Sequence, residues 1–392
     1  MEYYQKDGYH PVEIGDCFHN RTMSSTNSIS ERYVAIKICT AGSDPIETDV
    51  LSQLSELIEP SDIGAAMIPS ILDRFTIQGP NGSHACLVTS PARMSLSQAK
   101  NESWISLFHI DVARALAAQL VAVIRYMHSR GYVHGDLHRG NILLQLQLNF
   151  DQLSTKELYE LYGEPKLEPV NRLDGQPTPS EVPKHGVVPI WLGEPSEKVT
   201  LPEARIILAD FGQTFSPARE KRFDSSTPLS IRPPEARFEP TTPLTFSSDI
   251  WTVACTIWDI LAHRSLFEGF LTNEDDMTCQ QIAALGPLPT EWWESWEGRA
   301  KHFTDNGEPN NRATSQYRSL EDLFELNVQQ PREMEGMPSI QLSERDALLA
   351  MLRPMLAFKP ENRPSAQQVL DSEWMVKWAI PEYERIRCSQ TS

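Results

Sequence analysis

One stretch of eight residues limits the possible folds of this chain more than any other. From His134 to Asn141 it places an acid, Asp136, five positions before the amide Asn141. The stretch lies between a segment with an apolar stripe of helical period, 110–127, and the apolar run 142–144. In such a loop a carboxylate can orient a substrate hydroxyl while the amide binds a metal ion. The sequence therefore predicts a helix, a polar loop that carries chemistry and a strand, in that order.

Two further apolar runs end in residues that suit the same chemistry. The run from Val34 to Ile36 leads to Lys37, whose ammonium can neutralise phosphate charge in a cleft. The run 206–208 leads to Asp210 and Gly212, and a carboxylate beside a flexible glycine suits a divalent metal. Each motif alone has an ordinary structural reading, as a solvated strand-end lysine or as a turn. Their order along the chain favours the chemical reading for all three.

This ordered set resembles the eukaryotic protein kinases, and in particular the serine/arginine-rich protein kinases in their fungal form. The resemblance extends from about Tyr33 to Met375 and includes three later matches, which are Arg232 to Glu235, Asp249 to Trp251, and Arg363. It implies that Arg363 pairs with Glu235. It also implies an α+β, two-lobed protein-kinase-like fold with a truncated small β-rich N-lobe and a mainly α C-lobe.

The resemblance assigns roles to the candidate site residues. Asp136 is the catalytic-loop base, and Asn141 and Asp210 are the Mg²⁺ ligands. Lys37 holds the α- and β-phosphates of ATP. The full set expected to bind the cofactor is Lys37, Glu47, Thr89, Ala92, Asn141 and Asp210.

The ion-pair partner of Lys37 and the hinge residue leave alternatives open. Glu47 is favoured as the partner of Lys37, while its place three residues after Asp44 also suits a capping box. Glu56 is the second candidate for the pairing. Thr89 falls at the gatekeeper position that the resemblance implies, although a threonine at a strand end has an equally ordinary structural reading.

Domain boundaries follow from the resemblance and from an uneven spread of prolines. We expect an N-terminal segment over 1–31, a kinase N-lobe over 32–92, a C-lobe over 93–380 and a tail over 381–392. Eight prolines fall between Pro165 and Pro202. They predict an insertion at about 145–203, with a disordered linker as the alternative for much of 165–202.

Hydrophobic periodicity predicts helices in the second half of the chain. The stretch 247–262 is apolar almost all round, which is typical of a central, buried helix. The stretches 348–355 and 366–378 also have helical character.

The sequence departs from the kinase pattern in three places. Only Gly8, Gly15 and Gly42 occur in the first fifty residues, so no glycine-rich loop over the phosphates is visible, which puts ATP affinity in doubt. Gly135 stands where many kinases carry an arginine that binds a phosphorylated activation loop, so we expect activity without that phosphorylation. His138 stands in place of a lysine, and an imidazole is mostly neutral above its ordinary pKa of about 6.5.

The charge balance indicates the kind of partner. Lys+Arg 35 against Asp+Glu 53 gives a net charge of −18, which argues against direct nucleic-acid binding and favours Arg-rich substrates. The acidic run from Glu274 to Asp276 is a candidate docking surface, although most such runs are solvated faces. No apolar run approaches the ~18 residues of a membrane span, and the six cysteines show no paired spacing. We therefore expect a monomer that binds no membrane, in the cytoplasm, the nucleus or both.

These observations predict a serine/threonine protein kinase that transfers the ATP γ-phosphate to serine in Arg/Ser-rich proteins. Two alternatives stay open. A pseudokinase scaffold fits the missing glycine-rich loop. The presence of Lys37, Asp136, Asn141 and Asp210 argues against it, because folding alone would not require these four residues. A small-molecule phosphotransferase of the aminoglycoside or choline type fits residues 134–141, but such enzymes generally lack the closing set that contains Glu235 and Arg363.

Overall fold

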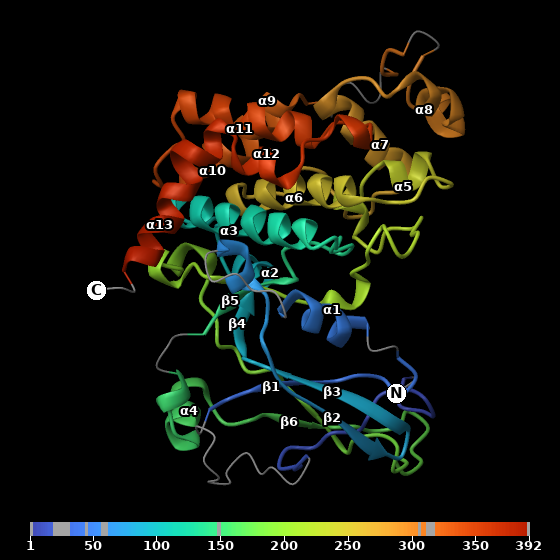
Figure 1. The fold of residues 1–392 in the computed structure, drawn as a ribbon, viewed down its shortest axis with the longest axis vertical. Helices are drawn as coiled ribbons and strands as arrows, with labels where there is room; N and C mark the ends of the chain where they lie inside the picture. The colour runs from blue at the N-terminus through green and yellow to red at the C-terminus, as the bar shows by residue number, and fades with distance from the viewer. Residues whose placement is uncertain are drawn as a thin grey trace. The chain divides into compact units, whose positions relative to one another are not determined.

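The computed structural model describes residues 3–18, 32–43, 46–55, 62–146, 150–304, 307–310 and 318–389 (Figure 1). These residues fall into two compact units. The first, called here the sheet unit, comprises Met1–Glu56, Pro69–Met94 and Gln145–Gly193. The second, the helical unit, comprises Leu57–Ile68, Ser95–Leu144 and Glu194–Ser392.

An antiparallel sheet of three strands organises the sheet unit. Its order is β1 (Ala35–Ile38), β3 (Gly82–Thr89) and β2 (Ile71–Gly79), and β4 (Ala92–Ser95) follows β3 in the chain. Gly82 closes the β2–β3 turn with φ +134°, which disfavours a side chain. The apolar run that leads to Lys37 forms a strand, since β1 contains it from Ala35 onward.

Helix α1 (Ile46–Ser55) follows β1 and buries Val50, Leu51 and Leu54, which recur at helical spacing. Asp44, the other member of the alternative capping box with Glu47, lies outside the described residues. Of the expected N-terminal segment 1–31, the structure describes 3–18.

The insertion expected at about 145–203 contributes ordered elements to the sheet unit. It contains a short 3₁₀ turn at Phe150–Gln152, α4 (Thr155–Tyr162), and a ribbon of β6 (Leu167–Pro169) with β7 (His185–Val187). Asn81, in the β2–β3 turn, joins it to the N-terminal segment, because its Nδ2 donates to both the Tyr9 and the Glu181 carbonyl oxygens. Buried amides with such partners fix a chain path as a strand ladder would.

Two long helices form the centre of the helical unit. They are α3 (Ile110–Ser129) and α6 (Phe246–Leu261), which pack on each other (Figure 1). Every residue of α6 from Ser248 onward is buried, as its all-round apolar sequence predicted. Helix α3 ends where expected, because Gly131 takes φ +82° just after its last turn.

Further elements surround this pair. The remaining α-helices are α2 (Leu96–Asn101), α5 (Glu235–Phe238), α7 (Glu274–Leu285), α8 (Thr290–Ser295), α9 (Leu320–Phe324), α10 (Gln330–Met334), α11 (Leu342–Met355), α12 (Ala366–Leu370) and α13 (Ile380–Cys388). The helical character expected over 366–378 is present but interrupted, because α12 ends at Leu370 and the chain turns at Asp371 before a π-helical segment at Met375–Ala379. Within the described ranges, no helix is both long and apolar enough to cross a membrane.

Candidate active site

The pairing of two neighbouring strands brings two of the predicted ligands to one end. Strand β5 (Ile142–Gln145) pairs antiparallel with β8 (Ile206–Leu208), and Ile142 lies opposite Leu208. The ladder continues one step further, since the Ala209 N–H donates to the Asn141 carbonyl at 2.8 Å. Asn141 before β5 and Asp210 after β8 therefore lie at the same end of the pair.

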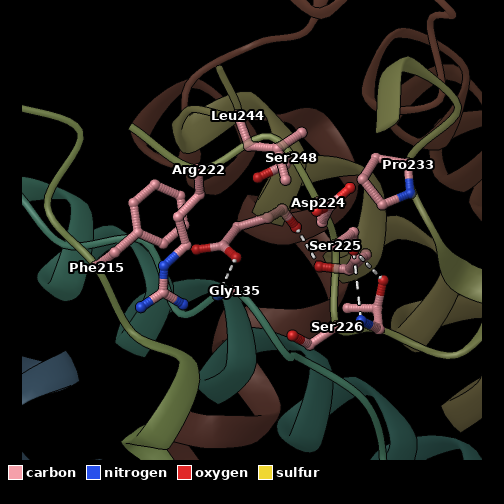
Figure 2. A pocket seen from close by; sticks show the side chains of 12 residues that line it. Gly135, Phe215, Arg222, Asp224, Ser225, Ser226, Pro233, Leu244 and Ser248 are labelled. Carbon is pink, nitrogen blue, oxygen red and sulfur yellow. Dashed lines mark hydrogen bonds between the residues drawn. The ribbon is translucent and has the colours of Figure 1, made fainter. Parts of the chain in front are cut away.

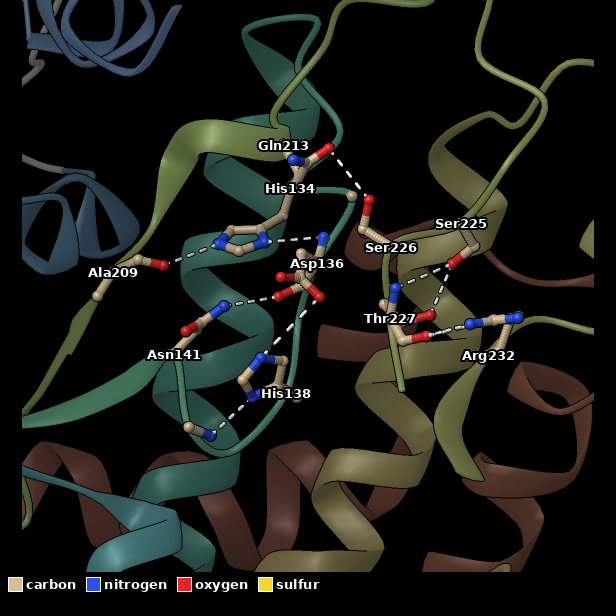
Figure 3. Close-up of polar contacts among 12 residues, drawn as sticks. His134, Asp136, His138, Asn141, Ala209, Gln213, Ser225, Ser226, Thr227 and Arg232 are labelled. Atoms are coloured by element: carbon tan, nitrogen blue, oxygen red, sulfur yellow. Dashed lines mark hydrogen bonds and ion pairs between the residues drawn. The ribbon is translucent and has the colours of Figure 1, made fainter. Parts of the chain in front are cut away.

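The catalytic loop folds back on itself around Asp136. Asn141 Nδ2 donates to the Asp136 carbonyl oxygen at 2.9 Å, and the Asn141 N–H donates to the His138 carbonyl at 2.9 Å (Figure 3). These bonds close the five-residue interval that was noted in the sequence. The structure thus brings Asp136, Asn141 and Asp210 together within the helical unit.

The Asp136 carboxylate lies in a desolvated position. Its Oδ1 is buried and has no hydrogen-bond partner among the described residues, and His138 Nε2 lies 3.9 Å from this oxygen. Burial raises the pKa of Asp136 and the nearby Asp210 raises it further, while His138 and His134 oppose the shift. A carboxylate with a raised pKa is a better proton acceptor than an ordinary one.

Two histidines of the loop have their ring protons fixed by hydrogen bonds (Figure 3). His134 Nε2 lies 3.2 Å from the Ala209 carbonyl, which can only accept, and its Nδ1 accepts from the Asp136 N–H. Burial lowers the pKa of His134, so this ring is neutral. His138 Nδ1 accepts from the Gly140 N–H at 3.0 Å, which leaves the proton of the neutral ring on Nε2, facing Asp136.

A buried carboxylate of α6 holds the start of the loop. Asp249 accepts from the His134 N–H at 2.8 Å, the Gly135 N–H at 3.2 Å and His128 Nε2 at 2.9 Å. Burial raises the pKa of Asp249, but the bond from His128 and the nearby charges outweigh it, and the net shift is downward. Gly135 fits its place because its φ is +78° and a Cβ would lie 2.5 Å from the Gln213 carbonyl oxygen.

Asp210 is held in an unusual backbone conformation. Its φ of +60° and ψ of +74° belong to the left-handed region, which costs a non-glycine residue about 1–2 kcal/mol. The next residue, Phe211, is fully buried against the His134 ring, with centroids 5.6 Å apart. Strain of this kind persists only where the surroundings over-determine it, which is common at functional sites.

The oxygen donors of Asn141 and Asp210 fit Mg²⁺. Asn141 uses its Nδ2 for the bond to the loop, so its Oδ1 is the atom that can meet a cation. Across the described ranges, no group of three or more His, Cys, Asp or Glu side chains could hold a metal ion. Mg²⁺ does not need one, because it usually keeps several waters and binds one or two protein oxygens together with substrate phosphates.

In the sheet unit, Lys37 pairs with Glu47. Lys37 Nζ lies 2.5 Å from Glu47 Oε2, and the side chains are 50% and 14% exposed. The favoured partner is confirmed as an ion pair, while the second candidate, Glu56, lies outside the described residues. Thr89 ends β3 opposite Ala35, and Ala92 begins β4. Their roles at a nucleotide stay predictions.

The segment after Asp210 is held by an arginine of its own. The Arg222 guanidinium lies over the Phe215 ring at 5.0 Å and donates to the Gln213 carbonyl at 2.6 Å. Ser226 Oγ donates to Gln213 Oε1 at 3.1 Å. Figure 2 shows Arg222 beside Gly135 in the small pocket that these side chains line. Arg222 thus holds this segment beside Gly135, the position at which many kinases carry the loop arginine.

The predicted closing ion pair is present. Arg363 donates to both Glu235 carboxylate oxygens, at 2.7 and 2.6 Å, and both side chains are buried. Arg363 also donates to the carbonyls of Ser247 and Phe358. A buried bidentate pair of this kind ties the end of the segment, at α5, to the start of α6.

Comparison with known proteins agrees with this geometry. No family model matches the chain. It is 25% identical over 397 residues to a serine/threonine protein kinase of Aspergillus fumigatus, covering 96% of this chain and 90% of that protein. It is 24% identical over 404 residues to the serine/threonine-protein kinase SRPK of Physarum polycephalum, covering 95% and 90%. Over nearly its whole length the chain is thus similar to serine/threonine protein kinases, one of them named SRPK.

A solved kinase domain has the same fold, with a TM-score of 0.58 at 17% identity over 88% of each chain. The expected α+β kinase fold, with a small sheet unit and a mainly helical unit, is therefore confirmed. The expected resemblance to SRPK-type kinases is confirmed by the named relatives.

Sequence reasoning missed some residues that shape the site. His128 orients Asp249, and Arg222 holds the segment after Asp210, yet neither was singled out. The signal for His128 was a titratable side chain in the last turn of a helix with an apolar stripe. For Arg222 no local pattern exists, because its partners are set by the fold of the segment.

Proposed function

We propose that the chain is a serine/threonine protein kinase that transfers the γ-phosphate of ATP to serine in Arg/Ser-rich proteins. The observation that carries the proposal is the closed catalytic loop, in which Asn141 bonds to Asp136 at the end of the ladder that leads to Asp210. This arrangement supports one site for a hydroxyl acceptor and a phosphate-bound metal. ATP and Mg²⁺ are its proposed cofactors.

Each residue has a defined task in this proposal. Asp136 in its ionised form orients the serine hydroxyl and accepts its proton. Asn141 and Asp210 would hold Mg²⁺, which neutralises the charge of the phosphates when it is bound. Lys37, oriented by Glu47, would bind the α- and β-phosphates. Catalysis then consists of positioning and charge neutralisation, without a covalent enzyme intermediate.

The net charge of −18 supports Arg-rich substrates. In the acidic run from Glu274 to Asp276 of α7, however, fewer carboxylates can meet a substrate than the sequence suggests. Asp275 Oδ1 accepts from Arg237 at 2.5 Å and from Trp296 Nε1 at 2.6 Å, so it is engaged inside the unit. Asp276 belongs to the capping box with Asn273. Glu274, with a side chain 56% exposed, is the member best placed to meet a substrate.

The segment after Asp210 supports activity without activation-loop phosphorylation. Arg222, Gln213 and Ser226 already hold it through the bonds described above. Phosphatase treatment should therefore leave turnover within about twofold, and a loss of turnover would contradict this part of the proposal.

The absent glycine-rich loop remains part of the proposal as well. Within the described residues, β1 is the first strand of the chain, and the stretch 19–31 lies outside them. We expect ATP to bind more weakly than in a kinase with that loop. We also propose a monomer that acts in the cytoplasm or nucleus.

The decisive experiment measures nucleotide binding and phosphate transfer on the full chain. Titration calorimetry with ATP, with and without Mg²⁺, should give binding that requires the metal. Radiolabelled phosphate should reach an Arg/Ser peptide, and a matched Ala/Ser peptide should accept at least tenfold less. Asp136→Asn should keep binding and lower turnover by about 10²–10⁴.

Each contrary outcome names an alternative. Transfer to choline or an aminoglycoside, but to no peptide, would replace the protein kinase by a small-molecule phosphotransferase. No binding of Mg·ATP and no transfer would leave a pseudokinase scaffold.

A further inference from the structure

The second half of the catalytic loop is held by contacts that no kinase motif predicted. The Arg139 carbonyl accepts from the Ser97 N–H of α2 at 3.1 Å. The Arg139 guanidinium Nη1 lies 3.9 Å from Asp259 Oδ2, in the last turn of α6. Arg139 stands between Asp136 and Asn141, so its position limits where both side chains can lie.

Lys100 joins the same two helices beneath the loop. It lies one turn after Ser97 on α2, and it is 2% exposed. Its Nζ donates to the carbonyl of Asp259 and, at 2.5 Å, to that of Ala262. These carbonyls belong to the end of α6, where backbone oxygens lack helical partners and attract a cation. Lys100 thereby fixes α2, and with it the Ser97 N–H, against α6.

This junction is costly, which argues that it does more than cap a helix. Burial lowers the pKa of Lys100 to about 7, and Asp259 only partly offsets that effect. Arg332 already donates to the Leu261 carbonyl at the same helix end, so a second buried cation is not needed for the cap alone. Asp259 Oδ1 is buried without a hydrogen-bond partner among the described residues, and burying such an oxygen lowers the stability of the fold.

Helix α6 therefore meets the catalytic loop on both sides of Asp136. Near its start, Asp249 binds the backbone of His134 and Gly135. Ten residues later, Asp259 faces Arg139. We propose that Lys100 and Asp259 are positioning residues that fix the second half of the catalytic loop through Arg139, as Asp249 fixes the first half. The effect on turnover rests on the proposed kinase function, whereas the effect on the loop does not.

Amide hydrogen exchange on the full chain tests the loop directly. In Asp259→Asn and in Lys100→Met, exchange of the amides of 137–141 should accelerate at least tenfold. The amides of His134 and Gly135, which Asp249 holds, should change less than threefold. The matched control is Asp62→Asn, which removes a half-buried carboxylate that binds Arg125 at 2.6 and 2.9 Å in the same unit. This control should leave both sets within threefold of the wild type.

A double-mutant cycle tests whether Asp259 acts through Arg139. Arg139 is partly exposed, so Arg139→Gln should fold, and it should accelerate exchange of 137–141 by itself. Adding Asp259→Asn to it should then have little further effect. If the wild type transfers phosphate, Asp259→Asn should lower kcat at least tenfold and change the KM for ATP less than threefold.

The outcomes separate this proposal from the proposed function. Equal acceleration of 133–135 and 137–141, or additive effects in the cycle, would show a general loss of stability and overturn the proposal. Should Asp259→Asn fail to fold, Lys100→Met and Arg139→Gln carry the same test. If the wild type transfers no phosphate, the proposed kinase function is rejected. The hydrogen-exchange result still decides whether Lys100 and Asp259 fix the second half of the loop.

Discussion

The catalytic loop and the Lys37–Glu47 pair carry the two halves of the proposed chemistry, and they are held in different ways. The loop is anchored by Asp249, which is 2% exposed and accepts three hydrogen bonds. Lys37 has a side chain 50% exposed, and its ion pair with Glu47 stands at the surface of the sheet unit. Buried, satisfied networks rigidify a site, whereas exposed ion pairs contribute little to stability. The difference indicates that the folded protein itself fixes the geometry of the catalytic loop. The position of the Lys37 side chain depends more on the ligand that it binds.

The largest expected effect separates two carboxylates of the loop region. Asp249→Asn should lower the free energy of unfolding at pH 7 by about 3–5 kcal/mol, because it breaks a buried network. Asp136→Asn should leave that free energy unchanged or raise it, because Asp136 is desolvated and its Oδ1 lacks a hydrogen-bond partner among the described residues. Urea denaturation of both variants measures the contrast.

The two carboxylates should also differ in the sign of their pH dependence. The folded-state pKa of Asp249 is lowered, so its contribution to stability is present above its unfolded pKa of about 4 and is lost as pH falls through the folded value. The pKa of Asp136 is raised, so its ionisation opposes folding as pH rises. If Asp249→Asn and Asp136→Asn lowered the free energy of unfolding equally at pH 7, the expected difference between the two carboxylates would be refuted.

A smaller effect is expected at Gly135. Gly135→Ala should lower the free energy of unfolding by about 2–3 kcal/mol, because a left-handed residue gains a Cβ that meets the Gln213 carbonyl at 2.5 Å. The matched control is Gly163→Ala, since Gly163 has φ +89° and no atom within 4 Å of its Cβ position. It should cost only about 1 kcal/mol. Similar losses at both sites, measured by thermal or urea unfolding, would refute the close-approach argument.

In the sheet unit, we expect a substitution to change ligand affinity more than stability. Glu47→Gln should change the free energy of unfolding by less than about 1 kcal/mol, because the pair is partly exposed. It should nevertheless raise the Kd for Mg·ATP about tenfold, or about 1.4 kcal/mol, because Lys37 loses its orientation. Glu13→Gln is the control, since Glu13 binds His185 in the same unit. A large loss of stability with unchanged ATP affinity would show that the pair is structural.

Salt should have the smallest effect. Raising the salt concentration from 50 to 300 mM should increase the KM for an Arg/Ser peptide a few-fold, because long-range attraction to the acidic chain is screened. The KM for ATP-dependent transfer to a neutral peptide is the reference and should hardly move. A salt-independent KM would argue against electrostatic docking.

Local patterns predicted much of the fold and of the site. The strands before Lys37 and Asp210 and the two central helices followed from hydrophobic runs and periodicity. The closing pair of Glu235 with Arg363 followed from the resemblance to the protein kinases. The helical character expected over 366–378 is present, but Asp371 and the turn after it divide the stretch, which periodicity alone does not indicate. Residues 150–193 also took ordered structure within the sheet unit, although their prolines fitted a linker equally well.

The sequence by itself determined which chemical groups are present and in what order, since strand alternation, helical period and turn residues act between near neighbours. Only the tertiary structure decided that Asp275 is engaged by Arg237 and that Lys100 and Arg139 both meet Asp259. The physical reason is that a buried polar group must find a partner wherever the packed chain offers one. That partner can stand more than a hundred residues away, where no local pattern can indicate it.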